Sequence, residues 1–229
     1  MRAPSPAPGR FPPETFPAAV TLPVVFGAAC WALSIVYFIV QAIAQAASTR
    51  PYSMATNVIS DLGNTACGAA MCSPLHGLMN VTFVVVGAFH WIGAIATYRA
   101  WPRRWLSFVA RALLALSGAF LVVVGLSPEN LKPYPHVLGA MVGLVALNLA
   151  MIALAGAIGA ARRWLGGMAL VAGTAGLLGF ALLVSGTGPP GATERLADYP
   201  GAVMVIVLGV YLLVAAVSEG RRRLHAGAR

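Results

Sequence analysis

Charged side chains are scarce in this sequence. Only 9% of its 229 residues are Asp, Glu, Lys or Arg, whereas 59% are hydrophobic. A soluble domain usually carries about 25% charged residues, so the chain has too little polar surface to cover a water-facing globule. The composition therefore excludes a soluble protein and predicts a polytopic membrane protein without a separate soluble domain.

Acidic residues are the rarest charged type: there are six, against 15 Lys and Arg, which leaves a net charge of +9. A basic chain could bind nucleic acid, but the aromatic and basic residues do not interleave as single-stranded nucleic-acid binding requires. Basic cytoplasmic loops that orient a membrane protein explain the charge, so we expect no nucleic-acid partner. The sequence also has no P-loop, Rossmann fingerprint or nucleophile elbow, and it identifies no cofactor.

Cysteine occurs three times. Cys67 and Cys72 lie in the run CGAAMC. Zinc sites usually contain two C-x2-C pairs, and a second pair is missing, so we predict no metal site. On an oxidising face of the membrane the spacing favours a disulfide. Cys30 stands alone in an apolar run and is expected to be a buried small side chain.

Long apolar runs fill most of the chain. Each is long enough to cross roughly 30 Å of hydrocarbon at about 1.5 Å per residue. Backbone groups in lipid must bond within the segment, and period-2 alternation is absent, so helices are expected instead of strands. We predict an all-α polytopic membrane bundle of six transmembrane helices, at residues 18–46, 75–98, 106–126, 136–160, 165–184 and 202–217. Outside this domain (residues 18–219), residues 1–17 are a Pro-rich lead expected to be disordered, and residues 220–229 are a basic tail.

Basic residues alternate between successive connections. Most lie in the N-terminal lead, the AWPRRW and ARRW turns and the C-terminal tail, while the other connections hold only Arg50, Lys132 and Arg195. Because cytoplasmic loops are rich in Lys and Arg, we expect a multi-pass protein of the cell membrane with both termini in the cytoplasm. The extracytoplasmic face then carries four of the six acids: Asp61, Glu129, Glu194 and Asp198.

The run NVISDLGN, residues 57–64, lies in the first extracytoplasmic connection. Polar residues follow the helical spacing i, i+4, i+7, i+8 and i+11, which places on one face Ser53, Asn57, Ser60, Asp61 and Asn64. We predict a short amphipathic helix here, ended by Gly63. The periodicity leaves open whether the polar face meets water or closes over a polar cavity.

Further polar residues are expected near the same end of the bundle. His76 and Asn80 are one turn apart in the second helix, and His136 opens the fourth. Glu194 and Arg195 precede the sixth. Polar residues inside a span are costly and often functional, although an interhelical hydrogen bond is the simpler explanation.

These motifs resemble a bacterial membrane family known as domain of unknown function 998. The resemblance rests on N-x-x-S-D-L-G at residues 57–63, on Asn80 with Gly87, on VGLSPEN leading to His136, and on Gly191 with Glu194 and Arg195. It covers most of the chain and implies a six-helix membrane protein without an assigned function. The arrangement also looks distantly like the Frag1/DRAM/Sfk1 membrane proteins, which implies a link to lipid handling.

Two functions compete. In the first, a lipid-associated structural or regulatory protein contains a polar network that closes the outer end of the bundle, with Asp61 paired to Arg195. Its residues are Asn57, Asp61, His136 and Arg195. Its partners would be membrane lipids, with a homo-oligomer or a membrane-protein partner left open.

The second function is an enzyme acting on a lipid or prenyl substrate at the outer leaflet. Ser60, Asp61 and His136 are its candidate catalytic residues, with His76 in a hydrolase-like variant and Asp61 as the acid in a cyclase or isomerase. Residues expected to bind the ligand are Asn57, His76, Asn80, Glu194 and Arg195. A transporter is less favoured, since the chain has few membrane-embedded charges and no pair of broken helices.

Overall fold

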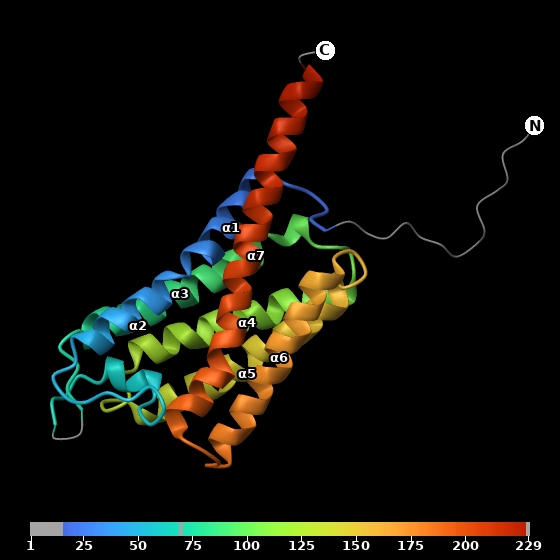
Figure 1. The fold of residues 1–229 in the computed structure, drawn as a ribbon. Coiled ribbons are helices and arrows are strands. Elements are labelled where there is room, and N and C mark those ends of the chain that lie inside the picture. Colours follow the sequence, from blue (N-terminus) through green and yellow to red (C-terminus); the bar gives the residue numbers. More distant parts are fainter. Residues whose placement is uncertain (1–15, 69–70, 228–229) are drawn as a thin grey trace, which may run out of the picture.

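A computed structural model describes residues 16–68 and 71–227 of the chain. Within these residues all regular elements are helical (Figure 1). The α-helices are α1 (Leu22–Leu33), α2 (Val36–Ala46), α3 (His76–Ala96), α4 (Trp105–Leu126), α5 (Pro133–Ile158), α6 (Arg163–Val184) and α7 (Pro190–Gly227). Two short 3-10 helices are η1 (Ile59–Gly63) and η2 (Tyr98–Ala100).

Six spans long and apolar enough to cross a membrane result from these helices. Helices α1 and α2 together form the first, Leu22–Ala46, and α3 to α7 supply the others. Ser34 separates α1 from α2, and its hydroxyl donates to the carbonyl of Cys30 on the preceding turn, a contact that often bends a helix. The predicted all-α architecture with six spans is confirmed.

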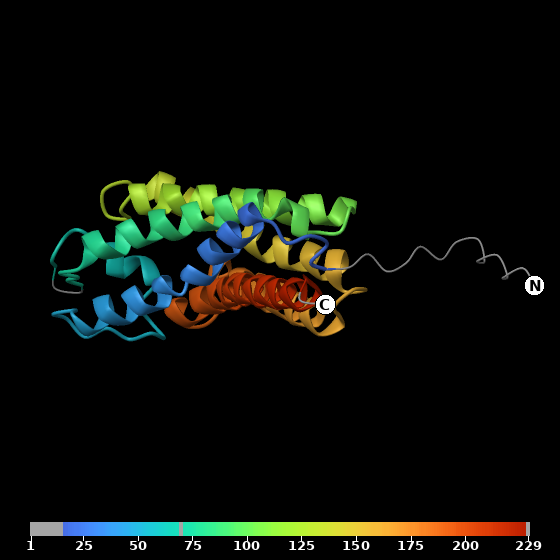
Figure 2. The same cartoon turned by 90° about the horizontal axis from the view of Figure 1, so that it is seen from above.

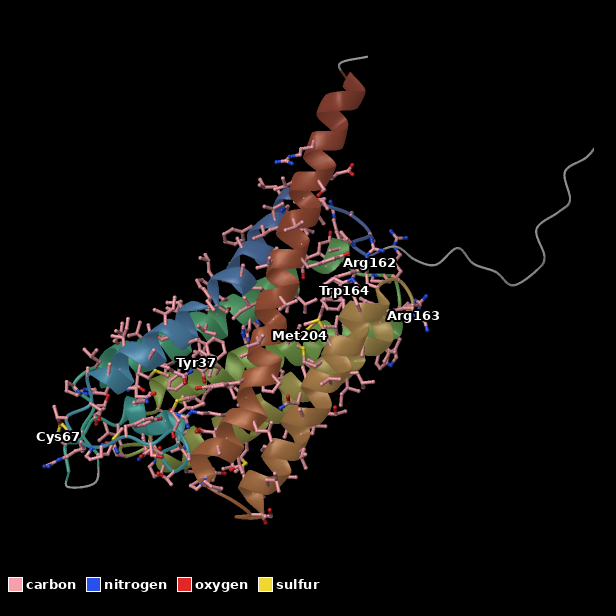
Figure 3. The ribbon with its side chains drawn as sticks, viewed as in Figure 1. Tyr37, Cys67, Arg162, Arg163, Trp164 and Met204 are labelled. Carbon is pink, nitrogen blue, oxygen red and sulfur yellow. A yellow bond between two sulfur atoms is a disulfide. The ribbon has the colours of Figure 1, made fainter. Side chains whose placement is uncertain are left out.

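The helices pack in a ring that follows the chain. Each of α3 to α6 packs against the next helix, and α7 closes the ring by packing on α1, which also contacts α3 (Figures 1 and 2). We call the end that carries residues 47–75, 127–132 and 185–189 the motif end. The opposite end, which carries residues 97–104 and 159–162, is the arginine end; Figure 3 shows Cys67 at the first and Arg162 at the second.

The start of the last helix differs from its prediction. Helix α7 begins at Pro190, not near residue 202, and includes Pro200 in its interior. The prediction treated Pro200 and the charges before it as a loop. One proline removes a single helix hydrogen bond, and Glu194, Arg195 and Asp198 find polar partners inside the protein. The predicted tail also continues α7 as far as Gly227.

The end of the N-terminal lead also differs from its prediction. The lead is predicted to be disordered through residue 17, yet the side chain of Phe16 is fully buried, stacked on Tyr211 and edge-on to Trp101 at the arginine end. The backbone N–H of Ala18 donates to the carbonyl of Ala100 at 2.8 Å. Residues 1–15 of the predicted lead lie outside the described residues.

Close approach of α3 and α4 depends on two glycines. A methyl group at Gly87 would lie 2.5 Å from the carbonyl oxygen of Gly118, and one at Gly118 would overlap the carbonyl of Gly87. Small residues let helix backbones touch in lipid, where packing replaces the hydrophobic effect as the associating force. This contact brings α4 close enough to α3 to line a shared cavity.

We therefore expect Gly87→Ala to lower the thermal midpoint in detergent. Overpacking costs about 1–3 kcal/mol, which exceeds the gain in helix propensity of about 1 kcal/mol. Gly77→Ala, also in α3, is the control because its added methyl has nothing within 4 Å, so its midpoint should stay the same or rise slightly. Equal midpoints for both variants would contradict the close packing.

Candidate functional site

The motif loop, residues 47–75, contains less helix than the sequence predicts. Only η1 is helical, with a turn before it and residues 69 and 70 not described. Arg195 donates hydrogen bonds to the carbonyl oxygens of Met54 and Asn57, each at 2.8 Å. In a helix these carbonyls would instead accept from backbone N–H groups of the next turn. The expected common polar face is not formed, since Ser60 is buried whereas Ser53 is exposed.

Arg195 fastens this loop to α7. Its Nη1 also donates to the carbonyl of Gly191 at 2.9 Å, and its Nη2 donates to the hydroxyl of Tyr52 at 2.5 Å. Burial raises the pKa of Tyr52 to about 12, against the opposing charge of Arg195, so the phenol keeps its proton and its oxygen accepts. Gly191 is required here, because a side chain would collide with the carbonyls of Met54 and Asn57.

Asp61 has a different partner from the predicted one. Its carboxylate accepts a hydrogen bond from the Asn57 side chain at 3.0 Å, whereas Arg195 binds the loop backbone. In the described part of the chain the two charged groups form no ion pair, so the predicted Asp61–Arg195 pair is wrong. Asp61 is partly exposed and does not line the cavity described below.

Asn80 and His76 support the other end of η1. Asn80 donates its amide to the carbonyl of Gly63 at 2.8 Å. The ring Nδ1 of His76 donates to the carbonyl of Ser73 at 2.8 Å, and the hydroxyl of Ser73 donates to Leu62 at 2.7 Å. These two predicted binding residues therefore hold the loop and lie outside the cavity lining.

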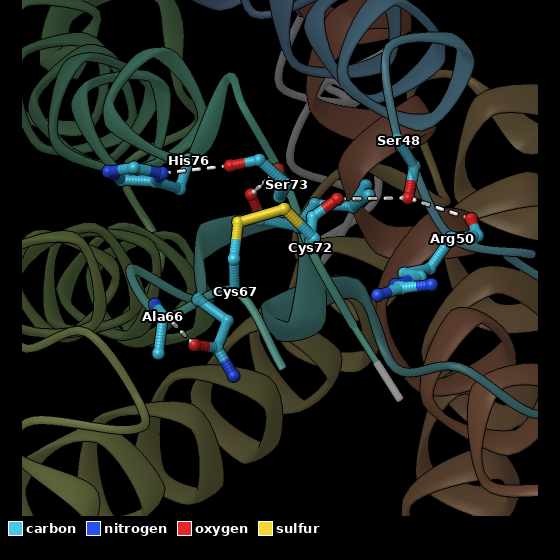
Figure 4. Close-up of a disulfide and its surroundings, with 9 residues drawn as sticks. Ser48, Arg50, Ala66, Cys67, Cys72, Ser73 and His76 are labelled. Atoms are coloured by element: carbon cyan, nitrogen blue, oxygen red, sulfur yellow. Dashed lines mark hydrogen bonds between the residues drawn. A yellow bond between two sulfur atoms is a disulfide. The ribbon is translucent and has the colours of Figure 1, made fainter. Parts of the chain in front are cut away.

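A disulfide closes the tip of the motif loop. Cys67 and Cys72 are bonded, as predicted (Figure 4). The hydroxyl of Ser48 donates to the carbonyls of Cys72 and Arg50, which ties the tip to the end of α2. The loop is thus fixed at its tip as well as at both sides of η1.

Beneath η1 lies a cavity of about 60 Å³. Its walls come from η1, α2, α3, α4, α5 and α7, and its polar lining consists of Tyr37, Ser60, His90, Ser117, His136, Glu194 and Asp198. Three of the predicted site residues therefore meet here: Ser60, His136 and Glu194. The volume is enough for about four water molecules.

Two carboxyl groups face this cavity from one side of α7. Glu194 and Asp198 are four residues apart, which places them on the same helix face. Glu194 accepts the backbone N–H of Ile59, and Asp198 accepts the hydroxyl of Tyr37 at 2.8 Å. Neither carboxyl forms an ion pair within the described residues. An unpaired carboxylate inside an apolar span is expensive, so the pair favours a bound proton, cation or polar group.

Two histidines complete the lining. The ring Nδ1 of His136 lies 2.8 Å from the carbonyl of Ser127; a carbonyl can only accept, so Nδ1 donates and Nε2 of the neutral ring remains an acceptor. His90 is 2% exposed, and neither ring nitrogen has a partner in the structure. Because buried polar groups are normally hydrogen-bonded, this ring offers its nitrogens to a polar group in this end of the cavity.

Four of the polar lining residues are not among the site residues that the sequence predicts. Tyr37, His90 and Ser117 lie within long apolar runs, and Asp198 lies in a predicted loop. The spacing of Glu194 and Asp198 was the available signal, since it gives a shared face once the helix is extended through Pro200. Among the described residues no three His, Cys, Asp or Glu side chains are arranged to hold a metal ion.

The hydrogen bonds from the guanidinium fork of Arg195 to the motif loop can be tested directly. Arg195→Met should destabilise the protein by more than about 3 kcal/mol, because several buried acceptors lose a charged donor. The thermal midpoint in detergent and the rate of Cys67–Cys72 reduction report the loss. Arg50→Met, an exposed substitution in the same loop, is the control. A loop that is equally protected from reductant in both variants would contradict the role of Arg195.

A family model described as "Protein of unknown function (DUF998)" matches residues 18–211. No curated protein and no solved structure matches the chain. The more distant likeness to the Frag1/DRAM/Sfk1 proteins therefore stays an expectation. The matched segment includes the motif loop, all lining residues of the cavity and the start of α7.

Proposed function

Because the chain belongs to the DUF998 family, whose description assigns no activity, we propose a function from the site itself. The cavity beneath η1 binds the polar end of a membrane amphiphile, a lipid or prenyl-type molecule, with Glu194 and Asp198 as an acid–base pair. One observation carries this proposal: two carboxyl groups face one cavity inside an apolar bundle, where the charge of Arg195 acts on both but forms no ion pair with either among the described residues.

The size of the cavity limits what part of a ligand enters. About 60 Å³ accepts a hydroxyl, an amine or a carbonyl and not a whole lipid, so the apolar remainder of the ligand must stay in the membrane. Leu121 of α4 and Gly143 and Leu144 of α5 line the cavity and are partly accessible. They support an entrance between α4 and α5.

Glu194 and Asp198 have different hydrogen-bond partners, which suits them to different roles in proton transfer. The hydroxyl of Tyr37 donates to Oδ2 of Asp198, which orients this carboxyl and leaves its other oxygen to exchange a proton with the ligand. Glu194 uses Oε2 to accept the N–H of Ile59, which leaves Oε1 to carry a proton toward the ligand. Proton transfer of this kind suits hydrolysis or isomerisation of a polar group. The acid role assigned to Asp61 thus moves to α7, while His136 stays in the site.

The motif end is proposed to face the extracytoplasmic side. Its connections hold few basic residues, whereas the arginine end holds most of them. The Cys67–Cys72 disulfide supports the same orientation, because disulfides persist in oxidising compartments. The ligand would then come from the outer leaflet of the cell membrane.

A structural role for the same residues is the second candidate. The bond from Ile59 to Glu194 and the fork of Arg195 favour it, since both fasten the motif loop to α7. In this case the acids would stabilise the fold and bind nothing. The two functions differ in what loss of Asp198, which contacts Tyr37 of α2 and not the loop, would do.

Ligand-induced stabilisation separates the candidates. In nanodiscs, dodecylamine and 1-dodecanol should raise the thermal midpoint and dodecane should not, since only a polar end enters the cavity. The amine should act more strongly because it neutralises the carboxyl pair. A ligand at 100 times its Kd stabilises by about 2.7 kcal/mol. Asp198→Asn should weaken amine binding at least tenfold, and Gly143→Val should weaken both ligands by narrowing the entrance.

Asp61→Asn is the matched control, because Asp61 is an acid at the same end that does not line the cavity. It should bind both amphiphiles as the wild type does. If Asp198→Asn lowers the midpoint strongly and leaves the amine response intact, the structural role replaces the proposed one. An equal response to dodecane would also contradict polar-end binding.

A further inference from the structure

The arginine end contains a second concave site, unrelated to the cavity beneath η1. It is a crevice of about 870 Å³ beside the connection between α3 and α4. Four arginines line it, Arg99, Arg103, Arg104 and Arg111, and its lining contains no acidic side chain among the described residues. Such a concentration of one charge in a concave site favours an anion.

Two buried donors in this crevice are unsatisfied. Ser107 is 3% exposed, and its hydroxyl has no hydrogen-bond partner. Arg111 is one helical turn further along α4, on the same face, and its Nε is also buried without a partner. Buried polar groups in proteins are normally bonded, so Ser107 and Arg111 together call for an acceptor that none of the described residues supplies.

An apolar groove continues from the crevice. Its volume is about 290 Å³, and it lies between α3 and α4, where it is lined by Ala94, Ile95, Ala112 and Ala115. Tyr98, Phe108 and Arg111 line both the groove and the crevice. A cationic mouth that opens into an apolar groove matches a molecule with an anionic head and a hydrocarbon chain.

Aromatic residues place the crevice at the depth of lipid headgroups. Trp105 is 72% exposed on α4, and Trp and Tyr side chains concentrate at membrane interfaces. The hydroxyl of Tyr98 accepts from Nε of Arg99 at 2.6 Å, and its ring lies under the guanidinium. Arg99 is therefore held in place at the mouth before any ligand arrives.

We propose that this crevice and groove form a binding site for one anionic phospholipid. Its phosphate lies against Arg99, Arg103 and Arg111 and accepts from Ser107, and one acyl chain lies in the groove between α3 and α4. Guanidinium groups suit a phosphate because their planar fork donates two hydrogen bonds at once. A free phosphate would satisfy the arginines and leave the groove unused, so the geometry selects the lipid.

Native mass spectrometry of the full chain with added phosphatidylglycerol tests the site. Arg111→Gln should lower its occupancy at least tenfold, and Arg99→Gln and Arg103→Gln several-fold each. Arg111→Lys keeps the charge and should retain most of the binding. Arg163→Gln is the matched control, since Arg163, the first residue of α6, lies at the same end and does not line the crevice. Ala115→Phe fills the groove and should weaken phosphatidylglycerol binding. The ability of inorganic phosphate to compete for the arginine crevice should not change in this variant.

Three results would overturn the proposal. One is equal occupancy of phosphatidylglycerol in the wild type and a folded Arg111→Gln variant. Another is equal binding of phosphatidylcholine, whose headgroup has no net charge. The third is inorganic phosphate binding as tightly as the lipid, which would make the crevice a phosphate site. Asp198→Asn should bind phosphatidylglycerol normally, so failure of this site is distinguishable from failure of the cavity beneath η1.

Discussion

The guanidinium of Arg195 organises the motif end of the protein. It donates to the carbonyls of Met54 and Asn57 from a helix that begins more than a hundred residues later in the chain. These bonds hold the loop backbone at Met54 and Asn57, and η1 begins two residues after Asn57. That register puts the backbone N–H of Ile59 against Glu194 and Ser60 over the cavity. Without the hydrogen bonds of Arg195, neither the position of η1 above the cavity nor that of Glu194 would be fixed.

Helix α7 divides its polar residues between two neighbours. Gly191 and Arg195 are one turn apart and face the motif loop, while Glu194 and Asp198 are one turn apart and face the cavity. Glu194 and Arg195 are therefore neighbours in the sequence, but the acid faces the cavity and the base binds the motif loop. A charge inside an apolar bundle is tolerable only with such partners, which explains why the polar residues of the chain are concentrated in so few turns.

The sequence predicts most of the architecture because long apolar runs leave a membrane protein few alternatives. The six spans and the disulfide follow from composition and local spacing. The errors arise where tertiary contacts override local signals. The short helix predicted in the polar run forms as η1 and ends at Gly63 as expected, but it begins only at Ile59 and does not carry the predicted common polar face. Pro200 predicts a loop, but the helix tolerates the loss of one bond. Of the candidate site, Ser60, His136 and Glu194 were reachable from sequence, whereas Tyr37 carries no signal within its apolar run.

The route by which a ligand reaches the cavity follows from how firmly its roof is attached. The fork of Arg195, the amide of Asn80 and the disulfide tip hold the motif loop at three separate places. Opening the roof would break the hydrogen bonds of Arg195 and Asn80, and every buried polar group left unpaired costs about 1–3 kcal/mol. Along the wall between α4 and α5 no hydrogen bond among the described residues ties Gly143 to α4, and a methyl group there would meet only ordinary van der Waals contacts. For the ligand proposed above, sideways entry from the membrane would therefore demand less reorganisation than entry through the loop.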